Sequence, residues 1–175
     1  MLNFAAKILQ LTSRKEYILG KILMERGLQL RIAESCTGGL LSSRLTDVSG
    51  SSAYTRANFV TYSDEAKRLI LGVSKETLKK YGAVSEECAR EMAEGLAAKT
   101  GCDIAVCTTG IAGPSGGTYE KPAGTVYIAV FFDGKTTVKK FSLSPRLNRK
   151  NMKFMFTEKA LETVLQIITE CFYEI

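Results

Sequence analysis

Residues 33–39, Ala-Glu-Ser-Cys-Thr-Gly-Gly, join a short apolar run to a helical pattern. A serine at such a strand-to-helix turn lies where backbone N–H groups point outward and attract negative charge. The position suits an activated serine nucleophile beside an oxyanion hole, or a cradle for a phosphate. The chain contains no histidine, so a Ser-His-Asp triad is excluded. As a nucleophile, Ser35 therefore needs a different base.

Lys67 occupies the position that best fits such a base. It lies one turn into a helix predicted over 64–71 and capped by Ser63, and helical side chains lean toward the N-terminus of their helix. The positive end of the helix and partial burial both favour a neutral amine. A neutral lysine can deprotonate Ser35, while Tyr62 could pass the proton or orient the pair.

A third loop, residues 109–117, is rich in glycine and follows another predicted strand. Together with the turns at Ser35 and Tyr62, it is expected at the carboxyl ends of the strands, where open α/β sheets bind ligands. Neither this loop nor the turn at 33–39 has the glycine spacing of a P-loop or of a dinucleotide fingerprint. ATP hydrolysis and dinucleotide redox chemistry therefore lack motif support.

The elements that must position these loops alternate between strands and helices. Strands are predicted at 28–33, 58–62, 103–108, 124–132 and 136–143, and helices with their caps at 15–26, 39–48, 63–71, 74–81, 85–100 and 149–172. This order predicts a three-layer α/β/α sandwich with a mixed, mostly parallel sheet. Because Lys7 interrupts the apolar run at 1–11, we expect a helix packed on the domain there rather than a signal peptide.

The composition favours one cytoplasmic domain over residues 1–175. A chain of 175 residues, 45% of them hydrophobic, can bury a full core. No apolar run approaches the roughly 20 residues needed to span a bilayer. Five cysteines without a C-x-x-C pair, in a chain without histidine, argue against structural zinc and for a reducing compartment. We therefore expect neither a metal nor a cofactor.

The net charge of +6 favours an anionic partner. Much of the excess lies in one segment, at Lys139, Lys140, Arg146, Arg149, Lys150 and Lys153. A solvated basic face, a site for a small phosphate compound and a nucleic-acid surface are the alternatives. Because the chain has no tryptophan and no recognised nucleic-acid-binding motif, nucleic acid is the weakest of these.

Several long motifs follow one another in an order that is found in one known family. They lie at residues 33–39, 50–54, 59–67, 71–73, 81–85, 109–117 and 121–126. On these motifs the sequence resembles the CinA C-terminal domain family, the nicotinamide-nucleotide amidases, over nearly its whole length. The resemblance implies that a single amidohydrolase domain converts nicotinamide mononucleotide to nicotinate mononucleotide and ammonia. It implies Ser35 as nucleophile, Lys67 as base and Tyr62 as the residue that assists proton transfer.

The resemblance also implies a set of substrate-binding residues: Thr37, Gly38, Gly39, Thr109, Gly110 and Arg149. Backbone amides around the first three would form the oxyanion hole, and the last three would contact the mononucleotide. An arginine suits that task because its fork pairs bidentately with phosphate or carboxylate. The implied partners are a small-molecule nucleotide and further copies of the chain in a homo-oligomer, with no membrane.

One segment departs from the family pattern. Before the last helix the family usually carries Gly-Asp-Arg, then an apolar residue and a second arginine, whereas this chain has Leu147-Asn148-Arg149 and then Met152-Lys153. Arg149 is kept, but the loop that presents it is changed. A catalytically silent nucleotide-binding or regulatory module is therefore the alternative function.

Overall fold

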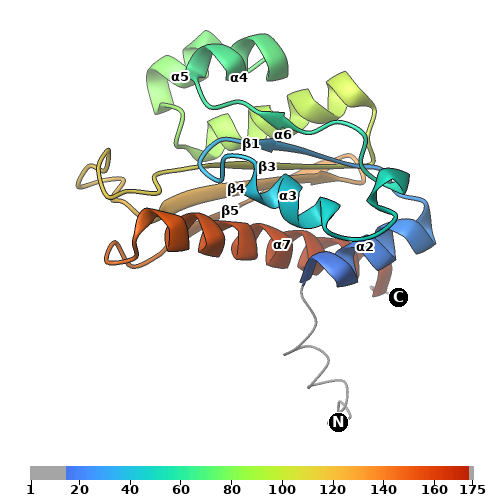
Figure 1. Cartoon of the computed structure of the whole chain (residues 1–175). Helices are drawn as coiled ribbons and strands as arrows, with labels where there is room; N and C mark the ends of the chain where they lie inside the picture. The colour runs from blue at the N-terminus through green and yellow to red at the C-terminus, as the bar shows by residue number, and fades with distance from the viewer. Residues whose placement is uncertain (1–14, 174–175) are drawn as a thin grey trace.

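The computed structural model describes residues 15–173, which form one five-stranded sheet between two layers of helices (Figure 1). The strands are β1 (Leu30–Glu34), β2 (Phe59–Val60), β3 (Ile104–Gly110), β4 (Thr125–Phe132) and β5 (Lys135–Ser142), in the spatial order β2-β1-β3-β4-β5. β1 pairs in parallel with β2 and β3, while β4 pairs antiparallel with β3 and β5. Of these strands only β4 runs against the others. The predicted sandwich with a mixed, mostly parallel sheet is confirmed.

The helices divide between the two faces of the sheet (Figure 1). One face carries α4 (Asp64–Leu71), α5 (Lys75–Tyr81) and α6 (Glu86–Thr100), and the other carries α2 (Lys15–Arg26), α3 (Leu40–Thr46) and α7 (Arg149–Tyr173). A short 3₁₀ turn, η1 (Ser51–Ala53), lies in the loop after α3. Each strand and helix predicted from residue 15 onward is present, with its ends displaced by at most two residues. The helix predicted over 1–11 lies outside the described residues.

The sheet separates two apolar cores, because successive side chains of a strand point to opposite faces. On β3, Ile104 and Val106 join the core formed with α2, α3 and α7. Ala105 and Cys107, on the alternate positions, join the core formed with α6. No helix among residues 15–173 combines the length and the apolar character that a membrane span requires.

The position of α4 depends on a close approach to α6. A Cβ atom at Gly95 of α6 would lie 1.7 Å from the carbonyl oxygen of Leu71 at the end of α4. Any side chain at residue 95 would push α4 away from the sheet. Glycine at this position therefore lets α4 settle beside the carboxyl end of β1 with Lys67 pointing inward.

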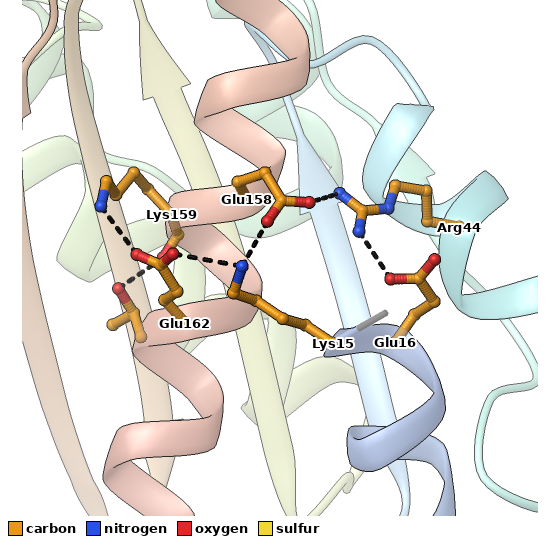
Figure 2. Close-up of polar contacts among 7 residues, drawn as sticks. Lys15, Glu16, Arg44, Glu158, Lys159 and Glu162 are labelled. Carbon is orange, nitrogen blue, oxygen red and sulfur yellow. Dashed lines mark hydrogen bonds and ion pairs between the residues drawn. The ribbon is translucent and has the colours of Figure 1, made fainter. Parts of the chain in front are cut away.

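A network of ion pairs joins α2, α3 and α7 (Figure 2). The guanidinium of Arg44 on α3 pairs with Glu16 on α2 at 2.6 Å and with Glu158 on α7. Lys15 pairs with Glu158 and, at 3.3 Å, with Glu162. Burial alone would lower the pKa of Arg44, but the hydrogen bonds to Glu16 and Glu158 raise it above its ordinary value. The network therefore fixes α3, which follows the Ser35 turn, relative to α7, which begins at Arg149.

Candidate active site

Ser35 and Lys67, 32 residues apart in sequence, lie within hydrogen-bond distance of each other. Lys67 Nζ is 3.2 Å from Ser35 Oγ and donates to the carbonyl oxygen of Thr61 at 3.0 Å. The amide of Ser35 donates to the carbonyl of Thr108 at 3.0 Å, which continues the β1–β3 ladder into the turn. The turn of Ser35 is thus fixed by β3, and the Lys67 side chain, on α4, is fixed by the segment directly after β2.

The surroundings of Lys67 favour its neutral form. The residue is 1% exposed, and burial lowers its pKa below the ordinary value of 10.5. Ionised Cys88, Asp64 or Cys36 would act in the opposite direction. However, burial raises the pKa of both Cys88 and Cys36 to about 12, so these thiols are uncharged near neutral pH. Within residues 15–173, no carboxylate forms an ion pair with Lys67. A deprotonated amine next to a hydroxyl is the arrangement that activates a serine nucleophile.

The turn that carries Ser35 is held by the carboxylate of Glu34. This fully buried side chain accepts hydrogen bonds from the amides of Gly39, Leu41 and Ser42 and from the Ser42 hydroxyl. It therefore caps the N-terminus of α3, where backbone donors have no helical acceptor. Gly39 itself has a φ of 93°, a backbone conformation that glycine adopts without strain.

This capping changes which amides are available beside Ser35. The amide of Gly39 donates to Glu34, and the amide of Gly38 donates to the carbonyl of Ser35 at 3.2 Å. Within the described part of the chain, the N–H groups of Cys36 and Thr37 have no oxygen acceptor. The amides left for a developing negative charge are therefore those of Cys36 and Thr37. Thr37 was among the expected donors, whereas the amides of Gly38 and Gly39 already have acceptors.

A cavity of about 250 Å³ opens over Ser35. It is lined by Ser35, Cys36, Tyr62, Gly110, Ile111, Ala112, Gly113, Ser115, Gly116 and Arg149. The turn after β1, the loop after β2 and the glycine-rich loop after β3 all contribute to it, so the three loops share one rim as the sequence predicts. In an open α/β sheet this rim is the usual position of a ligand site.

Tyr62 and Arg149 lie together at this cavity. One guanidinium nitrogen of Arg149 donates to the Tyr62 hydroxyl at 2.8 Å, and the other donates to the carbonyl of Gly113 at 2.8 Å. The Tyr62 side chain is largely exposed, at 60%. Arg149 thereby connects the start of α7 to the loops after β2 and β3. Its cationic group faces the cavity without a carboxylate partner among residues 15–173.

Two of the predicted site residues point elsewhere. The hydroxyl of Thr109 donates to the carbonyl of Ala83 at 2.7 Å, in the loop between α5 and α6. The hydroxyl of Thr37 shares a 2.8 Å hydrogen bond with that of Thr108. Both threonines are essentially buried and neither lines the cavity. Their side chains fix the loops, whereas Gly110 lines the cavity directly.

Sequence reasoning missed Glu34 and Thr61. An acidic residue directly before a helix start is a signal for capping, and it identifies Glu34 in retrospect. Thr61 contributes through its backbone carbonyl, which any residue type could supply, so its identity carries no signal. The structure also leaves the Thr61 hydroxyl without a hydrogen-bond partner among the described residues.

Comparison with known proteins places this site in a wider group. Residues 12–168 match the family model described as the CinA C-terminal domain. A CinA-like protein of Chloroherpeton thalassium is 51% identical over 152 residues, which are 86% of this chain and 36% of the relative. The chain spans about a third of the length of the curated relatives it matches.

Solved structures with the same fold support the match. The competence damage-inducible protein A (ComA) of Klebsiella pneumoniae superposes with a TM-score of 0.84 at 37% identity, covering 89% of this chain and 95% of that one. A CinA superfamily protein of Escherichia coli gives a TM-score of 0.83 at 35% identity, with 87% and 88% of the two chains covered.

Proposed function

This chain belongs to the CinA C-terminal domain family, and from that premise we propose that it is an amidase that hydrolyses the carboxamide of nicotinamide mononucleotide. The single observation that carries the proposal is the 3.2 Å approach of the buried Lys67 amine to the Ser35 hydroxyl. Amide hydrolysis needs a nucleophile, a proton donor for the departing ammonia and donors for a tetrahedral oxyanion. The residues around Ser35 supply all three.

The first half of the reaction forms an acyl-enzyme. Neutral Lys67 accepts the hydroxyl proton of Ser35 as Oγ bonds to the carboxamide carbon, and the carbonyl oxygen becomes an oxyanion. The amides of Cys36 and Thr37 donate to that oxyanion. Lys67 then returns the proton to the amide nitrogen, the carbon–nitrogen bond breaks and ammonia leaves.

The second half releases the acid. Water enters the position that ammonia has left, and Lys67 accepts one of its protons as the oxygen bonds to the acyl carbon. Collapse of the second tetrahedral intermediate breaks the ester bond to Ser35 and returns the proton to Oγ. The products are nicotinate mononucleotide and the free enzyme. Arg149 and Tyr62, at the cavity, orient the nucleotide during both halves.

The test is an ammonia assay on the purified protein with nicotinamide mononucleotide. We expect steady ammonia release from the natural protein and none above background from Ser35→Ala. In mass spectra of rapidly quenched reactions, an adduct on residues 33–39 would identify the acyl-enzyme. Nucleotide binding without ammonia release would contradict the amidase and support the regulatory module instead.

A further inference from the structure

The cavity over Ser35 is small compared with typical sites for small molecules. Its volume of about 250 Å³ falls below the range of roughly 300–1,000 Å³ in which small-molecule sites lie. The cavity holds Ser35, so the carboxamide ring must occupy it. We expect the rest of the substrate to extend into a neighbouring space.

Such a space adjoins the cavity at Arg149, which lines both. A second pocket of about 500 Å³ is formed by Leu40, Arg149, Lys150, Lys153 and Phe154. Leu40 is the first residue of α3 and the other four belong to the first two turns of α7. One nucleotide can thus span the two pockets by passing Arg149.

The second pocket is strongly cationic. Arg149, Lys150 and Lys153 bring three positive side chains to it, and none of them has a carboxylate partner among residues 15–173. The first turn of α7 contains no acidic residue, although the positive end of a helix favours anions and disfavours cations. These three cations at the positive end of α7 destabilise the folded protein in the absence of an anion. Such a destabilising arrangement is expected where the cations serve to bind an anionic ligand.

Lys153 is the cation that lies closest to the nucleophile turn. A Cβ atom built on Gly38 would lie 3.1 Å from Lys153 Nζ, and the amide of Gly38 is bonded to the carbonyl of Ser35. The ammonium group therefore lies beside Gly38, in the same turn as the reacting serine. The ring of Phe154 forms the opposite, apolar part of the pocket and is held by Arg44, whose guanidinium lies 5.3 Å from the ring centre.

We propose that this second pocket binds the phosphate of the substrate nucleotide and that Lys153 is the residue that selects for it, an inference that rests on the proposed amidase. A phosphate monoester carries close to two negative charges at neutral pH, which three cations can match. The Thr109 hydroxyl, in contrast, donates to the carbonyl of Ala83, and Thr109 lines neither pocket.

The test compares nicotinamide mononucleotide with nicotinamide riboside, which has the same carboxamide and ribose but no phosphate. Lys153→Met should raise KM for the mononucleotide about tenfold, as expected for one lost charge-assisted hydrogen bond. Its kcat, and its KM for the riboside, should stay as in the natural protein. Lys153→Arg should restore the low KM. Lys135→Met, which removes the same charge at the opposite end of the sheet, is the matched control.

Inorganic phosphate tests the same pocket without turnover. It should inhibit the natural protein competitively with the mononucleotide and inhibit Lys153→Met far more weakly. Equal effects of Lys153→Met on both substrates, or no effect on either, would overturn the phosphate site and leave the amidase standing. If no ammonia is released at all, calorimetry of mononucleotide binding decides separately: weaker binding to Lys153→Met supports the pocket, and equal binding overturns it.

Discussion

Two of the buried cationic side chains among the described residues, Lys67 on α4 and Arg44 on α3, are accommodated in opposite ways. Burying a charge is costly unless it is paired or lost. Arg44 is paired with Glu16 and Glu158, and its pKa is raised (Figure 2). The hydrogen bonds of Lys67 go to uncharged groups, the Ser35 hydroxyl and the Thr61 carbonyl, and burial lowers its pKa.

The difference between the two residues separates a structural role, that of Arg44, from a candidate catalytic role, that of Lys67. A guanidinium with two carboxylates stays charged at any ordinary pH, so Arg44 can only hold helices together. An amine without a carboxylate can give up its proton, so Lys67 can exchange one with Ser35. Both side chains are buried, so the chemical type of the cation and its partners, rather than burial itself, decide which one becomes a candidate base. Four experiments break or sharpen this contrast.

Removing the amine should produce the largest effect. Lys67→Met should lower kcat for ammonia release about 10³-fold, because general-base catalysis typically contributes 10²–10⁴-fold. The measurement is steady-state ammonia release across pH, with Lys135→Met as the control for a lost lysine. Retention of more than a tenth of the natural kcat would mean that another group deprotonates Ser35.

Removing the paired cation should instead affect folding. Arg44→Met removes the guanidinium that pairs with the buried Glu16 and leaves Glu158 paired with Lys15, and breaking a buried pair typically costs about 3–5 kcal/mol. The free energy of unfolding from urea titration should fall by that order. At temperatures where the variant is folded, kcat should fall far less than in Lys67→Met. A loss of kcat comparable to that of Lys67→Met in the folded variant would contradict the division of roles.

The position of Lys67 could be predicted from the sequence, whereas the ion pairs of Arg44 could not. Lys67 could be placed because its position follows from a local signal, the Ser63 cap, and from the rim that parallel strands share. The ion pairs of Arg44 join residues 28 and 114 positions apart, and no local pattern encodes such a separation. The overall sheet was predictable because strand and helix periods are local properties.

The direction of individual side chains at the rim was harder to predict. Thr109 was expected to contact substrate, but β3 directs its hydroxyl to the carbonyl of Ala83, a backbone group from a distant loop. The oxyanion donors were expected around Thr37, Gly38 and Gly39, but the amide of Gly39 donates to the carboxylate of Glu34. Both outcomes depend on which backbone groups already have partners, which sequence patterns do not show.

Placing a carboxylate beside Lys67 should make it a charged, ion-paired side chain like that of Arg44. Cys88 is buried and, among the ionisable groups around Lys67, would interact with the amine most strongly. Cys88→Asp should therefore raise the pKa of Lys67 and lower activity at neutral pH about tenfold, because an opposite charge nearby favours the protonated amine. Cys88→Ser is the matched control without a charge. Activity of Cys88→Asp should recover as the pH rises. A profile that coincides with that of Cys88→Ser would show that the carboxylate leaves the lysine unpaired.

The smallest effect concerns the stability cost of burying Lys67. Its pKa is lowered in the folded protein from an ordinary value of 10.5. Between the lowered value and 10.5 the unfolded chain therefore binds more protons, and stability rises with pH. Below that window burial penalises the charged amine fully, and above it both states are neutral and the penalty disappears. Lys67→Met should consequently unfold at a higher temperature than the natural protein at neutral pH.

That advantage should shrink as the pH approaches 10.5, which thermal unfolding at a series of pH values can measure as a difference between the two proteins. The same difference for Lys135→Met, at an exposed position, controls for the general loss of a lysine and should show no such trend. A constant advantage of Lys67→Met at all pH values would indicate better apolar packing by methionine rather than relief of a buried charge. A decline confined to the alkaline range would show that Lys67, unlike Arg44, is retained at the expense of stability because its proton can leave.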